Sequence, residues 1–184
     1  DIAPSNPEVQ KYYGLLLWKR GDANAEPYVI GALKVLRNDP ELWNAMGDVM
    51  LKKGEAATAE QAFDRAISLE NREAFLGKAK ALSMLGRREE AGEALAQVIH
   101  DGAADAGIIL EYASLKIESG EHEEAIRALS LMSKEASPAD KRRASLLQAR
   151  CHELSGWWMI FTCTRKGFIP ELNSKKGRLI LYPK

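Results

Sequence analysis

The histidines and cysteines are the residues whose chemistry could serve catalysis or metal binding, and their spacing favours neither. His100, His122 and His152 are scattered along the chain, and no two of them form the His-Glu-x-x-His pair that places two zinc ligands on one helical face. Cys151 precedes His152, but adjacent helical residues point about 100° apart, so a nucleophile and its base are not expected there. Cys151 and Cys163 match neither a zinc-ligand spacing nor a redox dithiol motif, which leaves the redox compartment open.

Other catalytic motifs are missing from the sequence as well. It contains no phosphate-binding G-x-x-x-x-G-K-[ST] loop, no G-x-S-x-G nucleophile elbow and no glycine fingerprint after a strand. His122-Glu123-Glu124 follows a glycine turn, where acidic side chains suit the positive end of a helix. We therefore expect a protein that is not an enzyme and that uses no cofactor and no metal.

Size and charge narrow the class of protein further. The chain has 184 residues, of which 46% are hydrophobic, enough for the core of one domain or of a short repeat array. The formal net charge is zero, so nucleic acid is not an expected partner. The charge is uneven, however, because residues 157–184 hold six basic residues and one acidic residue, a net of +5.

The sequence also bears on localisation. No stretch approaches the roughly 18 apolar residues of a membrane span, so we expect no transmembrane segment. Asp1 to Pro7 does not resemble a signal peptide, and the missing initiator Met indicates a trimmed or mature chain from which a targeting segment could have been removed. These features leave the compartment open.

A glycine recurs along the chain at nearly constant intervals, and it organises the whole sequence. The successive spacings are 33, 32, 34 and 36 residues, between Gly21, Gly54, Gly86, Gly120 and Gly156. From the second glycine onward a small residue follows five positions later and a large apolar residue four positions after that: Ala59 and Phe63, Ala91 and Leu95, Ala125 and Leu129. Repetition at this period is typical of stacked helical hairpins.

Each part of the repeat has a physical role in such a hairpin. The glycine ends one helix in a conformation that side chains disfavour, and the next helix folds back antiparallel. The small residues let two backbones approach, and the large residue at i+4 fills the space against the next hairpin. One hairpin cannot bury its own apolar face, so each repeat must stack on its neighbours.

With these residues the sequence resembles the tetratricopeptide repeat family. The best copy runs from Pro40 to Leu69 and matches the family pattern with Trp43, Met46, Gly47, Met50, Gly54, Ala59, Phe63 and Ala66. The resemblance implies an all-α fold, an α-solenoid of about four helical hairpins with a capping helix and a tail outside the repeat pattern. The expected divisions are an N-terminal extension 1–6, repeats 7–39, 40–71, 72–105 and 106–138, a capping helix 139–155 and a tail 157–184.

The tail leaves the repeat pattern at Trp157. Aromatic and β-branched residues favour a strand in Trp157 to Thr164, and Leu179 to Tyr182 offers a second short run after the turn-prone Asn173, Ser174 and Gly177, so a hairpin is one option. Three interpretations stay open: a capping element on the last repeat, a disordered or foreign appendage, and a basic-aromatic segment that binds a partner or touches a membrane.

The resemblance also implies a function, because in this family the first helix of each hairpin lines a concave groove that holds a peptide or a helix of a partner protein. The partner-binding residues that it nominates here are Lys11, Leu15, Trp18, Lys19, Asn44, Asp48, Leu51, Lys52, Leu76, Lys80, Met84, Leu110, Ser114 and Ile117. Exposed apolar members of this set would mark the partner site.

We therefore expect a protein-interaction scaffold, in style closest to bacterial tetratricopeptide accessory proteins of envelope machines such as pilus-assembly factors. The alternative is a structural module that self-assembles into a homo-oligomer through its C-terminal end and tail.

Overall fold

A computed structural model describes residues 6–132, 136–154, 168–173 and 178–183 of the chain. The chain divides into two compact units, residues 1–108 and residues 109–184. Helices make up the described part of the first unit, and the second contains helices followed by one pair of strands. Apart from this strand pair, the regular secondary structure of the described residues is helical, as the sequence predicts.

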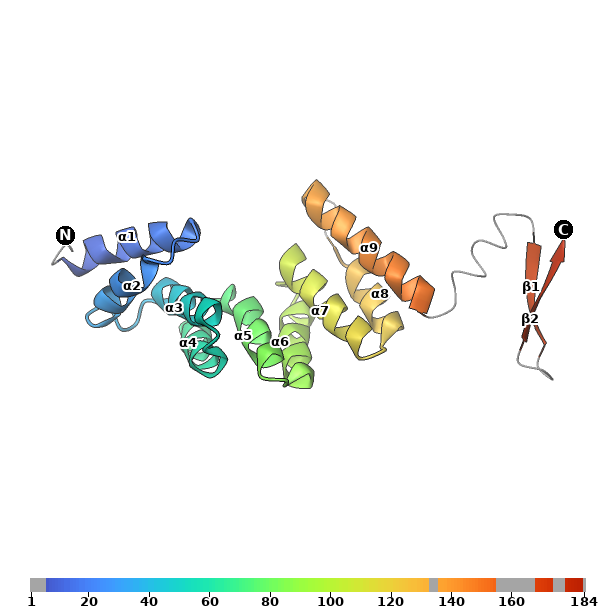
Figure 1. Ribbon diagram of the computed structural model, residues 1–184, viewed down its shortest axis with the longest axis horizontal. Helices are drawn as coiled ribbons and strands as arrows, with labels where there is room; N and C mark the ends of the chain where they lie inside the picture. The colour runs from blue at the N-terminus through green and yellow to red at the C-terminus, as the bar shows by residue number, and fades with distance from the viewer. Residues whose placement is uncertain (1–5, 133–135, 155–167, 174–177, 184) are drawn as a thin grey trace. The chain divides into compact units, whose positions relative to one another are not determined.

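Three helical hairpins form the first unit (Figure 1). They pair α1 (Pro7–Lys19) with α2 (Ala25–Leu33), α3 (Pro40–Lys53) with α4 (Ala56–Ser68), and α5 (Ala74–Met84) with α6 (Arg88–His100). Each hairpin also contacts the next, because α2 packs on α3 and α4 packs on α5. The first helices are neighbours too, since α3 contacts both α1 and α5.

The ends of these helices follow from local residue types. The Asp39 carboxylate accepts hydrogen bonds from the backbone N–H groups of Glu41 and Leu42, and Pro40 occupies the first helical position, where no N–H is needed. At the other end of α3, Gly54 has φ of 82°, and the N–H of Glu55 donates to the carbonyl of Met50. Gly21, Gly86 and Gly120 share this left-handed conformation, which confirms the predicted turns. Gly156 lies outside the described residues.

Phe63 is the centre of the core of this unit. Its side chain is fully buried between α3 and α5, where Gly47 and Gly77 leave room for the aromatic ring. A Cβ atom added at Gly47 would lie 2.5 Å from Phe63 Cε1, and one added at Gly77 would overlap the ring as well. Alanines such as Ala59 and Ala66 complete this core, which confirms the close approach of helices through small residues.

The second unit contains α8 (His122–Ser130) and α9 (Pro138–Leu154), and α7 (Ala106–Glu118) runs into it from the first unit. A hydrogen bond joins α7 to α8, because the Tyr112 hydroxyl donates to Glu124 Oε1 at 2.6 Å. Lys116 lies 2.9 Å from Glu121 Oε2 and 3.3 Å from Glu124 Oε2. These ion pairs explain how Lys116 is tolerated where the repeat pattern favours a large apolar residue. Helix α9 packs on α8.

The tail contains an antiparallel strand pair whose partners differ from those the sequence suggests. Strand β1 (Phe168–Asn173) pairs with β2 (Arg178–Pro183) in a register that places Phe168 opposite Pro183 and Asn173 opposite Arg178. The run Leu179 to Tyr182 is thus a strand, but it pairs with the segment just before the turn, because a short connection joins adjacent strands. Residues 157–164, the other predicted strand, lie outside the described residues.

Tyr112 makes stability depend on pH in the alkaline range. Burial, then the hydrogen bond to Glu124, raises the pKa of its hydroxyl from 10.0 to about 12, although Lys116 opposes the shift. The unfolded chain therefore releases this proton at a lower pH than the folded chain does, and folded stability falls as pH rises from about 10 to about 12. We expect the Tyr112→Phe variant to lose less stability over this range in urea titrations. An equal loss in both proteins would contradict the assignment.

Candidate partner-binding surface

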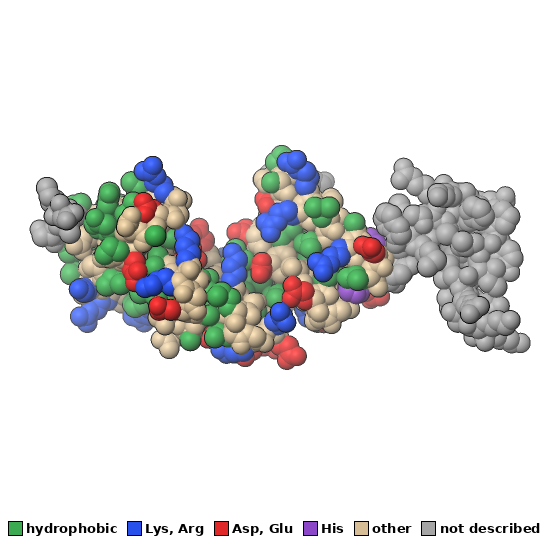
Figure 2. Space-filling model, in the orientation of Figure 1, with side chains coloured by type: hydrophobic (Ala, Val, Ile, Leu, Met, Phe, Trp, Pro, Cys, Tyr) green, Lys and Arg blue, Asp and Glu red, His purple; other side chains and the backbone are tan. Residues whose placement is uncertain are grey.

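Nine of the nominated residues in the first unit are exposed or half-buried, and we call them the first-helix face. They come from α1, α3 and α5, the first helices of the three hairpins: Lys11, Trp18, Lys19, Asp48, Leu51, Lys52, Leu76, Lys80 and Met84. Figure 2 shows hydrophobic and charged side chains interspersed over these helices. A surface of this mixed composition suits a partner that offers both apolar and charged groups.

Trp18 anchors the face to the core. Its half-buried indole packs against buried residues of both core clusters in the first unit. The Nε1–H group donates a hydrogen bond of 2.9 Å to Asp48 Oδ2, which links α1 to α3. A large aromatic side chain held in one orientation loses little conformational freedom when it contacts a partner.

Lys11 and Lys19 bind α1 to the start of α3. Lys11 forms an ion pair with Asp39, whose other oxygen caps α3, and Lys19 Nζ lies 2.9 Å from Glu41 Oε1. The hydrogen bond to Asp39 is the main cause that raises the pKa of Lys11, and the hydrogen bond to Glu41 does the same for Lys19. These ammonium groups are already engaged within the chain.

Lys52 and Lys80 differ from those two lysines, because both are exposed and neither pairs with a carboxylate of a described residue. Lys52 belongs to the last turn of α3, and Lys80 lies in the middle of α5. An exposed cation without a partner keeps its full capacity to bind an anionic group.

A pocket of about 170 Å³ brings Trp18 and Lys52 together at one end of this face. The pocket is lined by residues of α1 and α3, of the turn after α1 and of the start of α2: Trp18, Gly21, Asp22, Ala23, Glu26, Val49, Lys52 and Lys53. Lys53 Nζ lies 2.8 Å from Glu26 Oε1, so this second lysine is paired. The pocket thus combines an apolar wall with the ammonium group of Lys52 and the carboxylate of Asp22, which accepts hydrogen bonds from Asn24, and its size suits a single side chain.

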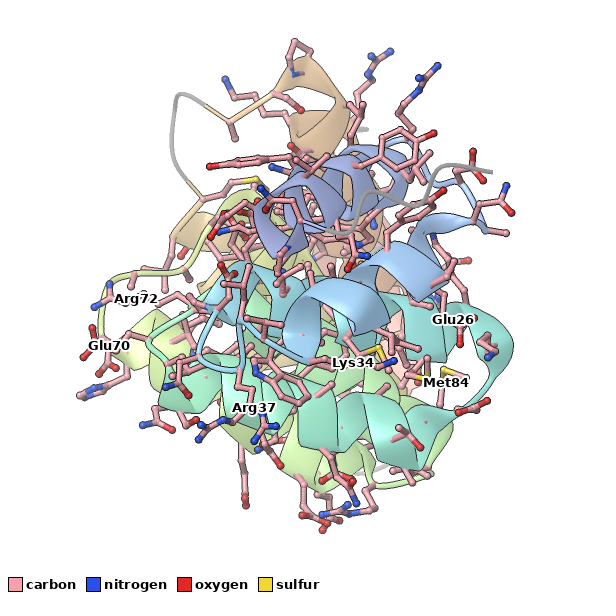
Figure 3. The ribbon with its side chains drawn as sticks, turned by 90° about the vertical axis from the view of Figure 1, so that its left-hand side faces the viewer. Glu26, Lys34, Arg37, Glu70, Arg72 and Met84 are labelled. Carbon is pink, nitrogen blue, oxygen red and sulfur yellow. The ribbon has the colours of Figure 1, made fainter. Side chains whose placement is uncertain are left out.

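The apolar residues of α3 and α5 extend the face away from this pocket. Leu51 is half-buried and packed on the core, Leu76 is half-buried, and Met84 is 55% exposed at the end of α5. Figure 3 shows Met84 on the opposite side from Glu70 and Arg72, which precede α5. An exposed methionine offers an adaptable apolar contact.

Four nominated residues are buried, and the first-helix face does not include them. Leu15 packs against Val29 and Leu42 in the core, and Asn44 is 5% exposed. In α7, Leu110 and Ile117 are 2% and 4% exposed, while Ser114 is half-buried. A buried side chain offers no surface to a partner, so these residues serve packing in this structure. The repeat register predicted their helix but not the depth of each side chain.

The pocket also contains residues that the sequence did not nominate. Glu26 and Lys53 form its ion pair, and Val49 contributes apolar surface from α3. Glu26 was missed because the nomination used only family positions on the first helices, whereas Val49 and Lys53 lie on a first helix, α3, at positions that the family pattern does not nominate. The turn at Gly21 was the sequence feature that could have indicated this pocket. In the structure the turn lies next to Lys52, since a Cβ atom added at Gly21 would lie 3.9 Å from Lys52 Nζ.

Metal binding and membrane insertion can be assessed for the described residues. Among them, no cluster of three or more histidine, cysteine, aspartate or glutamate side chains could hold a metal ion. None of the helices in the described ranges combines the length and the apolar composition that crossing a bilayer requires.

Comparison with known proteins supports the fold. No family model matches this sequence, and no curated protein matches it. Among solved structures, YrrB, titled a tetratricopeptide repeat protein with an unusual peptide-binding site, has a TM-score of 0.59 at 14% identity, covering 88% of this chain and 93% of that one. MamA from Desulfovibrio magneticus RS-1, from residue 41 to its end, has a TM-score of 0.63 at 19% identity, covering 88% and 94%.

A third structure, a tetratricopeptide repeat protein from Bacteroides fragilis NCTC 9343, has a TM-score of 0.50 at 18% identity and covers 94% of this chain and 80% of that one. The shared feature of these structures is the repeated helical hairpin. The chain therefore has the fold of tetratricopeptide repeat proteins, as its sequence pattern implies.

Proposed function

We propose that this chain is a protein-interaction scaffold that binds a peptide or a helix of a partner protein on the first-helix face. The observation that carries the proposal is the pocket in which the indole of Trp18 and the unpaired ammonium of Lys52 meet. The fold supports it, because YrrB, a structure of the same fold, is described by its peptide-binding site.

The chemistry of the face indicates what the partner segment carries. An apolar side chain would lie against Trp18 and Val49, with a carboxylate next to Lys52. Lys80 offers a second available cation, and Met84 offers an apolar contact. Such a partner is a short segment with apolar and acidic side chains in alternation.

Charge reversal at Lys52 tests this proposal. Peptides selected from a random display library on the wild-type chain should be enriched in acidic residues beside apolar ones. We expect Lys52→Glu to weaken their binding by about tenfold or more, because the carboxylate would then face a like charge. The measurement is the dissociation constant from isothermal titration calorimetry at two salt concentrations.

Lys34→Glu is the matched control for that experiment, because Lys34 is an exposed lysine at the end of α2, outside the first-helix face. It should leave the affinity within about twofold of wild type, the range of a surface charge far from a contact. Equal losses in both variants, or a selection that yields no acidic peptides, would rule the pocket out as the binding site. Trp18→Ala should also abolish binding while the helix content is retained.

The finer role follows from the sequence and stays a proposal. Alanine-rich repeats resemble those of bacterial envelope accessory proteins, so we propose assembly of an envelope machine as the setting, and fractionation of the source cells would test it. We also propose that the chain is divided as the sequence predicts, with repeats such as 40–71 and 72–105, and that each repeat contributes its own contacts to the partner.

The alternative function is self-assembly through the tail. Light scattering of a chain ending at Ser155 would test it.

A further inference from the structure

Helix α1 carries an exposed apolar stripe, at one edge of which Tyr13 packs edge-to-face on Tyr28 of its hairpin partner α2. Val9, Tyr12, Tyr13 and Leu16 are 47%, 68%, 44% and 52% exposed. Their spacing of three and four residues places them on one helical face. Figure 2 shows hydrophobic side chains gathered over α1. Four large apolar residues in one row are more than the isolated exposures of a typical surface.

The positions that correspond to Val9, Tyr12 and Leu16 are buried in the next two repeats, whereas those that correspond to Tyr13 are half-buried. The glycine spacings of 33 and 32 residues relate α1 to α3 and then to α5, so the equivalent sets are Val9, Leu42 and Ala74; Tyr12, Ala45 and Gly77; Leu16, Val49 and Ala81. Helix α2 packs on α3, and α4 packs on α5, whereas none of the described helices precedes α1. The stripe on α1 is thus the face that in the later repeats receives a neighbouring helix.

A helix that packs as closely as α4 packs on α5 could not pack on the stripe of α1, because the side chains of the stripe are too large. On α5, the ring of Phe63 from α4 occupies the space left by Gly77, which a single added Cβ would fill. Tyr12 stands at the equivalent position and fills that space with a phenol ring. A second helix of the repeat type could not approach α1 as closely, so the stripe requires an occupant that packs against aromatic rings.

The charges at the two ends of α1 are opposite in sign, which makes the helix complementary to a second, antiparallel α1. Glu8 and Arg20 are exposed, and neither forms an ion pair with another described residue, although Glu8 acts electrostatically on Lys11 one turn along α1. Glu8, Tyr12, Leu16 and Arg20 form one row at intervals of four residues. When two such rows meet antiparallel about a two-fold axis, Glu8 of each copy faces Arg20 of the other, and Tyr12 faces Leu16.

We infer that this face is an interface between two copies of the chain, formed by antiparallel pairing of their α1 helices. One register satisfies both the apolar contacts and both ion pairs, which is the self-complementarity that a two-fold interface demands. The stripe and the first-helix face use different side chains of α1, although the two surfaces adjoin where Lys11 Nζ lies 5.8 Å from the centroid of the Tyr12 ring. The inference does not rest on the proposed function.

Charge exchange in the full chain tests the inference, with sedimentation velocity or light scattering as the measurement. Wild type should be a dimer, and Leu16→Glu should raise the dimer dissociation constant by at least about tenfold, because a buried charge would replace an apolar contact. Glu8→Arg and Arg20→Glu should each weaken the dimer, since each brings like charges together. An equimolar mixture of these two variants should regain dimers, because both ion pairs form again in the mixed dimer.

Leu131→Glu is the matched control, since Leu131 is 61% exposed at the end of α8. It should leave the dimer unchanged. Because all the substituted side chains are exposed, circular dichroism should show wild-type helix content in every variant. A wild-type chain that stays monomeric up to millimolar concentration would overturn the inference, and so would a dimer that is indifferent to Leu16→Glu or is not restored by mixing.

Discussion

The Phe63→Ala variant is expected to unfold with a free energy about 3–5 kcal/mol below that of the wild type. Phe63 is the largest fully buried side chain among the described residues, and its ring fills the space between Gly47 of α3 and Gly77 of α5. Two glycine backbones line the cavity left by the ring, and neither has a side chain that could fill it. The variant thus loses both the burial of the ring and the contact between the second and third hairpins.

Urea denaturation followed by circular dichroism measures this loss. Val35→Ala is the control, because Val35 is 63% exposed and its truncation should change stability by less than about 0.5 kcal/mol. Since neighbouring repeats support each other, α3 to α6 should lose protection from hydrogen exchange first. A variant that unfolds within 1 kcal/mol of wild type would show that the ring is not the link between these hairpins.

The hairpin architecture could be predicted from the sequence because its determinants are local. Gly54 adopts φ of 82° and ends α3, and Asp39 with Pro40 begins it. These residue types act through the conformation of a few neighbouring atoms, so they have the same effect wherever they occur in the chain. The same reasoning explains why all the described glycines of the repeat end their helices alike.

The candidate site could be predicted only in outline. Family positions placed Leu15 and Trp18 on the same surface, but Leu15 packs into the core while Trp18 is half-buried beside a pocket. The difference in burial between Leu15 and Trp18 depends on the distance between α1 and α3, which cannot be predicted from the repeat spacing. Ion pairs such as Lys19 with Glu41 depend on the same distance, so the sequence could not tell engaged lysines from available ones.

The tail shows a different limit of sequence reasoning. The apolar segment Trp157 to Thr164 has the stronger β propensity, yet β2 pairs with the segment Phe168–Asn173, which contains Pro170. The two paired segments are close in sequence, and closing a short connection costs less conformational entropy than closing a long one. Propensity indicates which residues can form a strand and leaves its partner undetermined.

Gly77→Ala should destabilise the chain by about 1–3 kcal/mol, the cost of adding a methyl group to a filled core. In an open helix position the same change stabilises by about 1 kcal/mol, so the sign of the effect reports on the Phe63 ring. The ring cannot move away from a new Cβ at Gly77, because Gly47 confines it on the other side. Gly92→Ala in α6 is the control, since a Cβ there would meet nothing within 4 Å, and this variant should be more stable than wild type.

A double-mutant cycle separates the steric cost at Gly77 from any other effect of the alanine. In the Phe63→Ala background the ring is gone, so Gly77→Ala should become stabilising by about 0.5–1 kcal/mol through helix propensity. The change of sign between the two backgrounds is the signature of direct contact between these positions. If Gly77→Ala had the same effect with and without the ring, the close packing of α4 on α5 through a glycine would be refuted. Tyr12 would then be no obstacle to a repeat-type helix on α1.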